Sequence, residues 1–251
     1  MTEARPALSY LETGDGRRLA YRLRTGRSPM LVFLPGYASD MDGAKAIALD
    51  GFAARAGLAM LRFDYSGTGS SEGSFADGTL ERWLDEALAM IDRLTQGPIV
   101  AIGSSMGGWI ALHVALRLPD RVRALVGISA APDFTDWGFT ADQEKRLLEQ
   151  GMIERPNPYG EPPQVTTRAF WQSGQALRVL GSPIAVDCPV RLVHGEADED
   201  VPVAVAMRLM AQLRSADVQL NIVKGGGHRL SEPNEIEAIV RTVAALVEPA
   251  P

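Results

Sequence analysis

The chain has 251 residues, of which 46% are hydrophobic, and it carries a formal net charge of −6. This length allows one large core, and α/β domains of this size commonly stay undivided, so we expect a single domain over residues 1–251. The basic residues are scattered singly or in pairs, which argues against a nucleic-acid partner. Because no apolar run reaches the roughly 18 residues that a spanning helix needs, we expect no transmembrane segment.

The N-terminus and the cysteine content predict a cellular compartment. Residues 1–10 contain neither an apolar signal region nor a basic amphipathic helix, so we predict no secretory signal and no mitochondrial transit peptide. The single cysteine, Cys188, excludes an intramolecular disulfide and fits a reducing compartment. We therefore expect a cytoplasmic protein in which Cys188 is an inert core thiol at the start of an apolar strand.

Short apolar runs alternate with amphipathic helical patterns along most of the chain. The predicted strands are residues 8–12, 19–24, 30–34, 60–63, 98–102, 124–129, 190–194 and 219–223. The predicted helices are residues 42–56, 80–94, 108–118, 203–213 and 235–247. This alternation is typical of an α/β fold with a mostly parallel, eight-stranded sheet and crossover helices. Because only residues 13–17 separate the first two strands, these should pair as an antiparallel hairpin.

The alternation stops at residues 131–187, which is longer than any ordinary connection between two strands. Helical patterns occur around residues 142–150 and 167–179, on either side of a proline-rich run at residues 155–163. Six of the sixteen aromatic residues lie here: Phe134, Trp137, Phe139, Tyr159, Phe170 and Trp171. We interpret the segment as a helical cap inserted after the sixth strand. A second independent domain is the alternative, but so short a segment would bury little core of its own.

Two pentapeptides match the Gly-x-Ser-x-Gly pattern that presents a nucleophilic serine between a strand and a helix. Residues 103–107 follow an apolar strand and precede a helix, and glycines on both sides of Ser105 let neighbouring backbones pass closely. Residues 69–73 lie instead in a polar loop, where Ser71 is expected to stabilise a turn. The flanking elements therefore select Ser105 as the candidate nucleophile.

A serine hydroxyl needs a neighbouring base, and the chain has three histidines. His113 falls inside the helix after Ser105, and His194 ends a strand where its ring would brace a loop. His228 follows three glycines after the last strand, at the sheet edge where ligand sites form in such folds. We therefore expect His228 to be the base.

The base in turn needs an acid that orients it and stabilises its cation. The candidates all follow the strand at residues 190–194, and spacing does not choose among them: Glu196, Asp198, Glu199 and Asp200. Whichever acid is used, the chain order is serine, acid and histidine. This order is the one expected of an α/β-hydrolase.

A tetrahedral oxyanion needs two oriented donors, for which backbone amides are typical. We expect the N–H of Met106, beside the nucleophile, and the N–H of Tyr37, because Pro35 in the same loop has no N–H. Asp64 lies in a glycine-rich loop after the fourth strand, and we interpret it as a brace for the site and not as part of a phosphate cradle. With three scattered histidines and one cysteine, we predict no metal site and no cofactor.

Four groups of residues carry a family resemblance. They are FLPGY at residues 33–37, RFDYSG at 62–67 with GSS at 69–71, GSSMGGW at 103–109, and SPI at 182–184 followed by CP at 188–189. Together they resemble the α/β-hydrolase superfamily, and within it the mitochondrial abhydrolase-domain branch of palmitoyl-protein thioesterases, also described as acyl-glucuronide esterases. The resemblance runs over residues 30–247. It implies Ser105 as nucleophile, His228 as base and Asp198, at the His-Gly-x-x-Asp position, as acid.

The resemblance has two departures. The lack of a transit peptide points to a bacterial relative of this branch, and the cap matches the branch poorly, which leaves the acyl-chain preference open. We expect a serine hydrolase that cleaves a small-molecule or protein-linked acyl ester or thioester through an acyl-Ser105 intermediate. S-acyl cysteine and acyl glucuronides are the first candidate substrates. Met106, Trp109 and the aromatic residues of the cap, above all Trp137 and Phe139, are candidate walls of the acyl pocket.

Two other function classes stay open on the sequence. A carbon–carbon bond hydrolase or lyase would use the same three residues, and turnover of vinylogous diketones against short thioesters would distinguish it. A non-catalytic binding protein on this fold is disfavoured because the three residue types occur in the expected order. A chain inert to a broad panel of esters would favour that second alternative.

Overall fold

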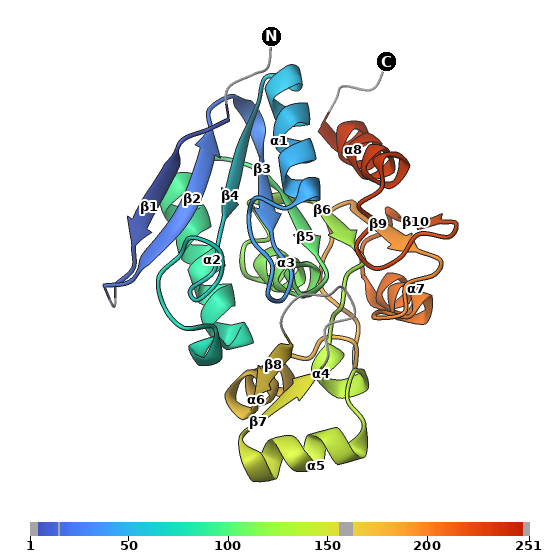
Figure 1. Ribbon diagram of the computed structural model, residues 1–251. Helices are drawn as coiled ribbons and strands as arrows, with labels where there is room; N and C mark the ends of the chain where they lie inside the picture. The colour runs from blue at the N-terminus through green and yellow to red at the C-terminus, as the bar shows by residue number, and fades with distance from the viewer. Residues whose placement is uncertain (1–4, 15, 156–162, 248–251) are drawn as a thin grey trace.

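The computed structural model describes residues 5–14, 16–155 and 163–247, and its centre is a β-sheet (Figure 1). The sheet strands are β1 (Leu8–Glu12), β2 (Arg18–Arg24), β3 (Arg27–Leu34), β4 (Leu58–Phe63), β5 (Ile99–Ser104), β6 (Val122–Ile128), β9 (Val190–Gly195) and β10 (Val218–Val223). They form one eight-stranded sheet in the order β1-β2-β4-β3-β5-β6-β9-β10. All eight predicted strands are confirmed, with small shifts at their ends.

The sheet is mostly parallel, as predicted. Six strands run parallel to one another: β4, β3, β5, β6, β9 and β10. The two remaining strands are antiparallel, since β1 pairs with β2 and β2 pairs with β4 in that direction. The predicted hairpin is therefore confirmed. Strands β4 and β5 are buried along their whole length, as expected where helices cover both faces of a parallel sheet.

Five helices cover the two faces of the sheet, at the positions that the helical patterns predict. On one face, α1 (Ala44–Ala56) and α8 (Pro233–Val247) pack against the strands. On the other lie α2 (Leu80–Leu94), α3 (Met106–Arg117) and α7 (Val203–Gln212). None of the helices in the described part of the chain is both long and apolar enough to cross a membrane.

The segment after β6 forms the cap, at residues 131–187 and at the lower end of the view in Figure 1. It contains α4 (Phe134–Trp137), α5 (Ala141–Gln150), β7 (Met152–Arg155), β8 (Gln164–Thr167) and α6 (Arg168–Ala176). The predicted helical cap is present, and it also contains a ribbon that was not predicted, in which β7 and β8 pair antiparallel. Strands of four residues are too short to show a clear alternating pattern in sequence.

Three side chains hold the two ends of the cap. The carboxylate of Asp133 accepts the backbone N–H groups of Val179 and Leu180, each at 2.8 Å. The carbonyl of Leu177 lies 3.0 Å from the indole Nε1 of Trp109 and 2.8 Å from the Nε2 of His113, both from α3. His113 is therefore a buried residue that holds the cap to α3. Burial lowers the pKa of His113, which favours a neutral ring that donates from Nε2.

Two predictions about the cap fall outside these observations. Tyr159 and most of the proline-rich run lie outside the described residues. The assignment of residues 1–251 to one domain stays a prediction, although Phe170, Val179 and Leu180 of the cap segment belong to the same hydrophobic cluster as the core of the sheet.

Candidate active site

Ser105 occupies the sharp turn between β5 and α3, with φ 53° and ψ −119°. A serine rarely adopts a positive φ, and such strain is typical of the turn that exposes a nucleophile above a sheet. The surrounding backbone holds this conformation. The N–H of Ser105 donates to the carbonyl of Ile128 at 2.9 Å, and its carbonyl accepts the N–H of Ala131 at 3.0 Å.

The two glycines of the pentapeptide are needed for space. A Cβ atom at Gly103 would lie 2.1 Å from the carbonyl oxygen of Gly107, and one at Gly107 would lie 2.0 Å from that of Leu34. No side chain fits at such distances unless the backbone moves. Gly103 and Gly107 therefore let neighbouring backbones pass close to Ser105, as the sequence predicts.

The second pentapeptide stabilises a loop, as predicted. The hydroxyl of Ser71 donates to the carbonyl of Asp64 at 2.7 Å and accepts the N–H of Ala20 at 2.8 Å. The carboxylate of Asp64 is buried and accepts the N–H groups of Met41 at 2.7 Å and Ser70 at 2.8 Å. Burial raises the pKa of Asp64 to about 6. Asp64 thus braces two loops at the carboxyl end of the sheet.

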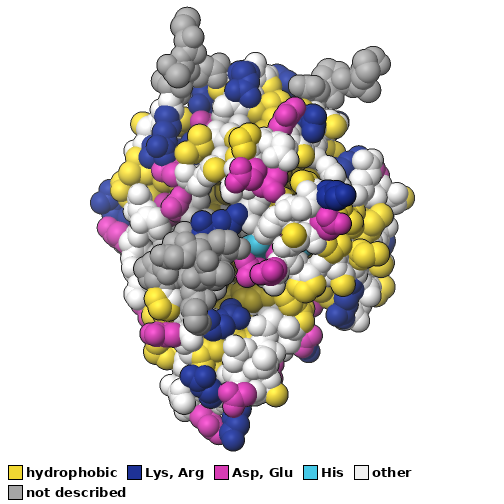
Figure 2. Space-filling model, turned by 45° about the vertical axis from the view of Figure 1, so that its right-hand side comes forward, with side chains coloured by type: hydrophobic (Ala, Val, Ile, Leu, Met, Phe, Trp, Pro, Cys, Tyr) yellow, Lys and Arg dark blue, Asp and Glu magenta, His cyan; other side chains and the backbone are white. Residues whose placement is uncertain are grey.

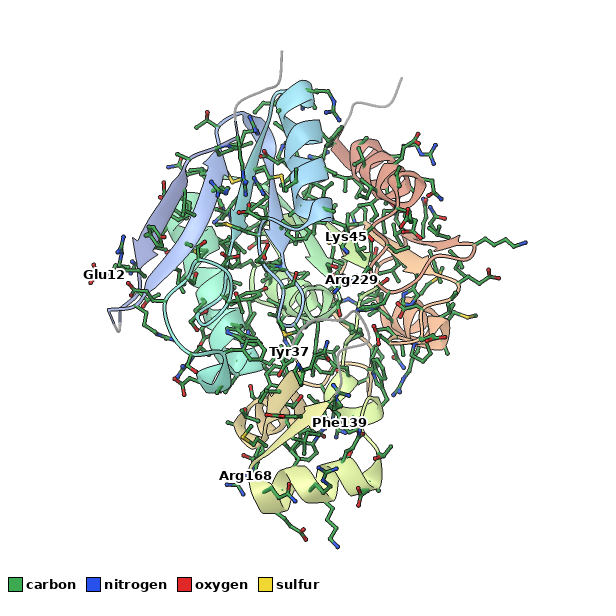
Figure 3. The ribbon with its side chains drawn as sticks, viewed as in Figure 1. Glu12, Tyr37, Lys45, Phe139, Arg168 and Arg229 are labelled. Carbon is green, nitrogen blue, oxygen red and sulfur yellow. The ribbon has the colours of Figure 1, made fainter. Side chains whose placement is uncertain are left out.

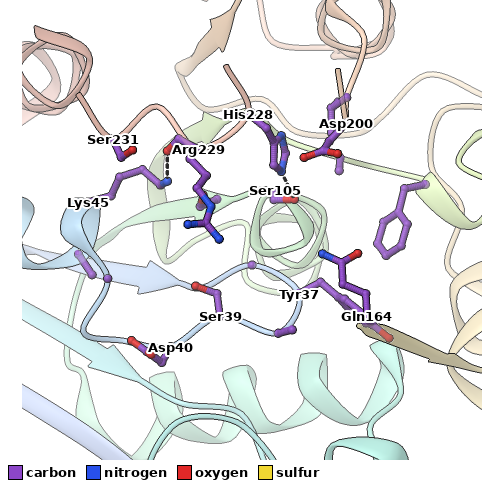
Figure 4. Close-up of a pocket in the computed structure, with 18 of the residues that line it drawn as sticks. Tyr37, Ser39, Asp40, Lys45, Ser105, Gln164, Asp200, His228, Arg229 and Ser231 are labelled. Atoms are coloured by element: carbon purple, nitrogen blue, oxygen red, sulfur yellow. Dashed lines mark hydrogen bonds between the residues drawn. The ribbon is translucent and has the colours of Figure 1, made fainter. Parts of the chain in front are cut away.

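The structure brings the three predicted catalytic residues together. His228, on the loop after β10, places its Nε2 atom 3.0 Å from the Oγ of Ser105 (Figure 4). Its Nδ1 atom lies 2.9 Å from the Oδ2 of Asp198. This chain of hydrogen bonds allows an imidazole to take the hydroxyl proton while a carboxylate stabilises the resulting cation.

Asp198 is the acid that bonds to His228 among the four that spacing left open. Its other oxygen, Oδ1, accepts the backbone N–H groups of Asp200 at 3.0 Å and Val201 at 2.8 Å. Burial alone would raise the pKa of Asp198, but the hydrogen bonds from His228 and Val201 outweigh it and hold the pKa below its ordinary value. The carboxylate is therefore ionised at neutral pH. The other three candidates, Glu196, Glu199 and Asp200, are exposed.

His194 braces the same loop, as the sequence predicted. Its buried Nε2 atom lies 2.8 Å from the carbonyl of Val201 and 3.4 Å from the Oδ2 of Asp198. Because the nearer partner is a carbonyl, Nε2 carries the proton and donates to it. His194 thereby fixes the backbone whose N–H holds Asp198.

The two predicted oxyanion donors flank the nucleophile. Met106 is the first residue of α3, and the N–H groups of the first turn of a helix have no acceptor within that helix. The loop of Tyr37 packs against the same turn, since a Cβ at Gly36 would lie 3.3 Å from the Cβ of Ser105. Their role as donors stays a prediction.

A cavity of about 650 Å³ opens above Ser105 and His228. Figure 2 shows a histidine side chain in the hollow of this face, with acidic and basic side chains around it. The cap contributes Phe134, Trp137, Arg155 and Gln164 to the wall, and the sheet edge contributes Tyr37, Lys45, Asp200 and Arg229. The wall therefore combines aromatic rings with both signs of charge.

Several of these wall residues were not predicted from the sequence. Lys45 lies in the first turn of α1, where it donates a hydrogen bond to the backbone carbonyl of Arg229, next to His228 (Figure 4). Burial lowers the pKa of Lys45 to about 8. Its place in the first turn of the helix that follows a parallel strand was a usable signal. Arg155 and Gln164 belong to the ribbon that was not predicted, so no sequence signal identified them as wall residues.

The predicted pocket residues divide into two groups. Phe134 and Trp137 of the cap line the cavity, whereas Met106, Trp109 and Phe139 do not. Trp109 is fully buried and anchors the cap through Leu177, and Met106 is also buried in the core. Phe139 lies deeper in the cap (Figure 3), where it packs in a cluster with Leu147 and Ile153. Aromatic residues near a nucleophile in sequence were over-interpreted, because the helix after the elbow turns Trp109 away from the cavity and into the core.

One group among the described residues could offer three ligands to a metal ion: Asp198, Asp200 and His228, with ligand atoms within 4.8 Å of one another. Two of these residues are already bonded to each other, since Asp198 accepts the Nδ1 proton of His228. Both oxygens of Asp198 are engaged in hydrogen bonds. The arrangement accordingly has the donors and acceptors of a proton-transfer chain.

This chain resembles proteins of a known family. A family model for the alpha/beta hydrolase fold matches residues 29–158. Human palmitoyl-protein thioesterase ABHD10, a mitochondrial protein, is 37% identical over 246 residues, which cover 96% of this chain and 80% of that protein. This chain belongs to the α/β-hydrolase family. The names of its relatives support hydrolase activity for it.

Two solved structures resemble this α/β-hydrolase over nearly its whole length. Alpha/beta hydrolase domain-containing protein 10 from mouse has a TM-score of 0.90 at 36% identity and covers 96% of this chain and 98% of that one. A protein from Agrobacterium vitis S4 has a TM-score of 0.91 at 38% identity, with 98% and 100% covered. The resemblance predicted from the sequence motifs is confirmed.

Proposed function

We propose that this α/β-hydrolase is a serine hydrolase that cleaves carboxylic esters or thioesters through an acyl-Ser105 intermediate. The observation that supports this most directly is the hydrogen-bond chain from Ser105 to His228 at 3.0 Å and from His228 to Asp198 at 2.9 Å. Its nucleophile sits in a strained turn at the mouth of a cavity. Those are the parts that acyl transfer requires.

In the first half of the reaction, the Oγ of Ser105 attacks the substrate carbonyl while the Nε2 of His228 takes its proton. The ionised carboxylate of Asp198 stabilises the imidazolium, and the N–H groups of Met106 and Tyr37 donate to the oxyanion. As the carbon–oxygen or carbon–sulfur bond breaks, His228 returns the proton to the leaving group. The acyl group remains on Ser105.

In the second half, water takes the place of the leaving group. His228 removes a proton from this water, whose oxygen attacks the acyl carbonyl and forms a second oxyanion in the same site. The carbon–oxygen bond to Ser105 then breaks, and His228 gives the proton to the serine oxygen. The products are a free carboxylic acid and the original enzyme.

The substrate class follows from the wall and from the relatives. Phe134 and Trp137 offer apolar rings to an acyl group. Because a mammalian relative is named a palmitoyl-protein thioesterase, acyl thioesters and S-acylated cysteines are the substrates to test first, with acyl glucuronides beside them. The cytoplasmic location stays a prediction, since that relative is mitochondrial.

A fluorophosphonate probe tests the nucleophile. The full chain should be labelled, the Ser105→Ala variant should not be, and Ser71→Ala, which removes the serine of the other pentapeptide, should be labelled like the wild type. Labelling of Ser105→Ala to the wild-type extent would contradict the proposal. A series of acyl thioesters of increasing chain length, with vinylogous diketones as competing substrates, then separates ester chemistry from carbon–carbon cleavage.

A further inference from the structure

The side chain of Tyr37 joins the loop after β3 to the cap. Its phenol donates a hydrogen bond to the backbone carbonyl of Val165, in strand β8 of the cap. Burial raises the pKa of Tyr37 to about 12, so the phenol keeps its proton and remains a donor at physiological pH. Figure 3 shows Tyr37 at the junction between the sheet and the cap.

The ring of Tyr37 is packed from both sides of this junction. From the body of the protein it contacts Phe75 and Trp83, with ring centroids 5.0 Å and 5.9 Å away. From the cap it contacts Phe134 at 6.0 Å and Phe170 at 4.8 Å. These edge-to-face and tilted contacts are favourable arrangements for aromatic rings. The ring is therefore fixed by the cap as well as by the core.

The loop that carries Tyr37 lies beside Ser105, since a Cβ at Gly36 would lie 3.3 Å from the Cβ of Ser105. Ala38 has a φ of 53°, a conformation that a residue with a side chain adopts reluctantly. The N–H of Ser39 closes the turn by donating to the carbonyl of Gly36 at 3.2 Å. Because this turn is disfavoured by itself, its contacts with the rest of the protein must hold it, and the Tyr37 side chain supplies a hydrogen bond and four ring contacts.

We propose that the Tyr37 side chain is a positioning group, which uses its contacts with the cap to hold the Tyr37 backbone N–H at the oxyanion site. The placement of the cap then sets the geometry of the oxyanion hole. This inference rests on the proposed function, because it assumes that the N–H of Tyr37 donates to the oxyanion.

The test is the Tyr37→Phe variant, which keeps the ring and removes the bond to Val165. A displaced oxyanion donor weakens binding of the transition state more than binding of the substrate. We therefore expect kcat for a thioester to fall about tenfold while KM stays within about twofold. The affinity for a boronic acid, which forms a tetrahedral adduct with the nucleophile, should fall by a similar factor, about tenfold.

Two variants serve as matched controls. Ser173→Ala removes another bond between cap and body, in which the Ser173 hydroxyl of α6 accepts the N–H of Glu81 in α2 at 2.8 Å. Tyr65→Phe removes a buried phenol that has no hydrogen-bond partner among the described residues. Neither change touches the loop of Tyr37. Both variants should keep kcat and the affinity for the boronic acid within about twofold of wild type.

The possible results separate this inference from the proposed function. If Tyr37→Phe keeps the wild-type kcat, or loses kcat without losing affinity for the boronic acid, the positioning role is wrong while the serine mechanism stands. An equal loss in Ser173→Ala would also overturn it, because loosening of the cap in general would then explain the effect. Failure of the proposed function is visible elsewhere, as unchanged probe labelling of Ser105→Ala.

Discussion

The sheet edge and the cap hold their functional residues in different ways. At the edge, backbone groups of the sheet and its loops fix two of the three proposed catalytic residues: Ser105 is held by Ile128 and Ala131, and Asp198 by Asp200 and Val201. The cap is held through a few side chains at its base. The edge is therefore built to keep one geometry, whereas the cap is tied to it by a small number of side-chain contacts, among them the hydrogen bond from Tyr37 to Val165.

The largest expected effect tests the edge. Replacing Asp198 by Asn removes the charge that orients His228, and kcat should fall about 10⁴-fold, as in other enzymes with this arrangement. The matched variant Asp200→Asn keeps its backbone N–H on Asp198 and should lose less than about threefold. Steady-state kinetics on one thioester measures both. A larger loss in Asp200→Asn than in Asp198→Asn would identify Asp200 as the acid.

A smaller effect is expected from the backbone of the elbow. A Cβ at Gly103 would lie 2.1 Å from the carbonyl oxygen of Gly107, so Gly103→Ala must displace the turn that carries Ser105. Because a shift of about 1 Å in a reacting group can cost about 10²-fold, we expect a loss of kcat of at least that size. Gly181→Ala, at a site with no atom within 4 Å of the added carbon, is the control and should behave like wild type. Normal activity of Gly103→Ala would show that the elbow tolerates distortion.

At the base of the cap, we expect stability to change more than activity. Trp109→Phe removes the bond to Leu177 and leaves unfilled volume, so the free energy of unfolding should fall by about 2 kcal/mol. Since Trp109 does not line the cavity, kcat should change less than about fivefold. Urea unfolding and kinetics on the same sample measure both. A large loss of kcat at unchanged stability would indicate that Trp109 contributes to the substrate pocket after all.

The smallest effect is expected for Asp133→Asn at the base of the cap. The new amide N–H₂ replaces one acceptor oxygen and faces a backbone N–H, so two donors meet and the free energy of unfolding should fall by about 1 kcal/mol. Burial raises the pKa of Asp133, so the folded state binds more protons than the unfolded state from about pH 4 up to that raised pKa. The contribution of Asp133 to stability therefore falls as the pH rises through this window. Urea unfolding should show a larger difference between the two proteins at pH 4 than at pH 7, and the opposite trend would contradict the assignment.

The fold was predictable because its signals are local. Continuous apolar runs mark the buried parallel strands, and β4 and β5 are buried throughout. The amphipathic pattern at residues 80–94 gave both ends of α2, where the side chain of Thr79 accepts the N–H of Arg82 as an N-cap. The ribbon of β7 and β8 was missed because four-residue strands carry too little periodicity.

The sequence by itself determined the proposed nucleophile and the proposed base, because a strand, a glycine-flanked serine and a helix are consecutive, and because elimination left His228 among three histidines. Spacing left the acid open and the family resemblance implied Asp198, but only the tertiary structure shows which acid contacts His228 and which aromatic residues face the cavity. Four carboxylates within five residues are equivalent in sequence, and they differ only once the loop folds and buries Asp198 while leaving its neighbours exposed. The direction in which a side chain points depends on the helix that carries it, as Trp109 shows, and that direction is a property of packing.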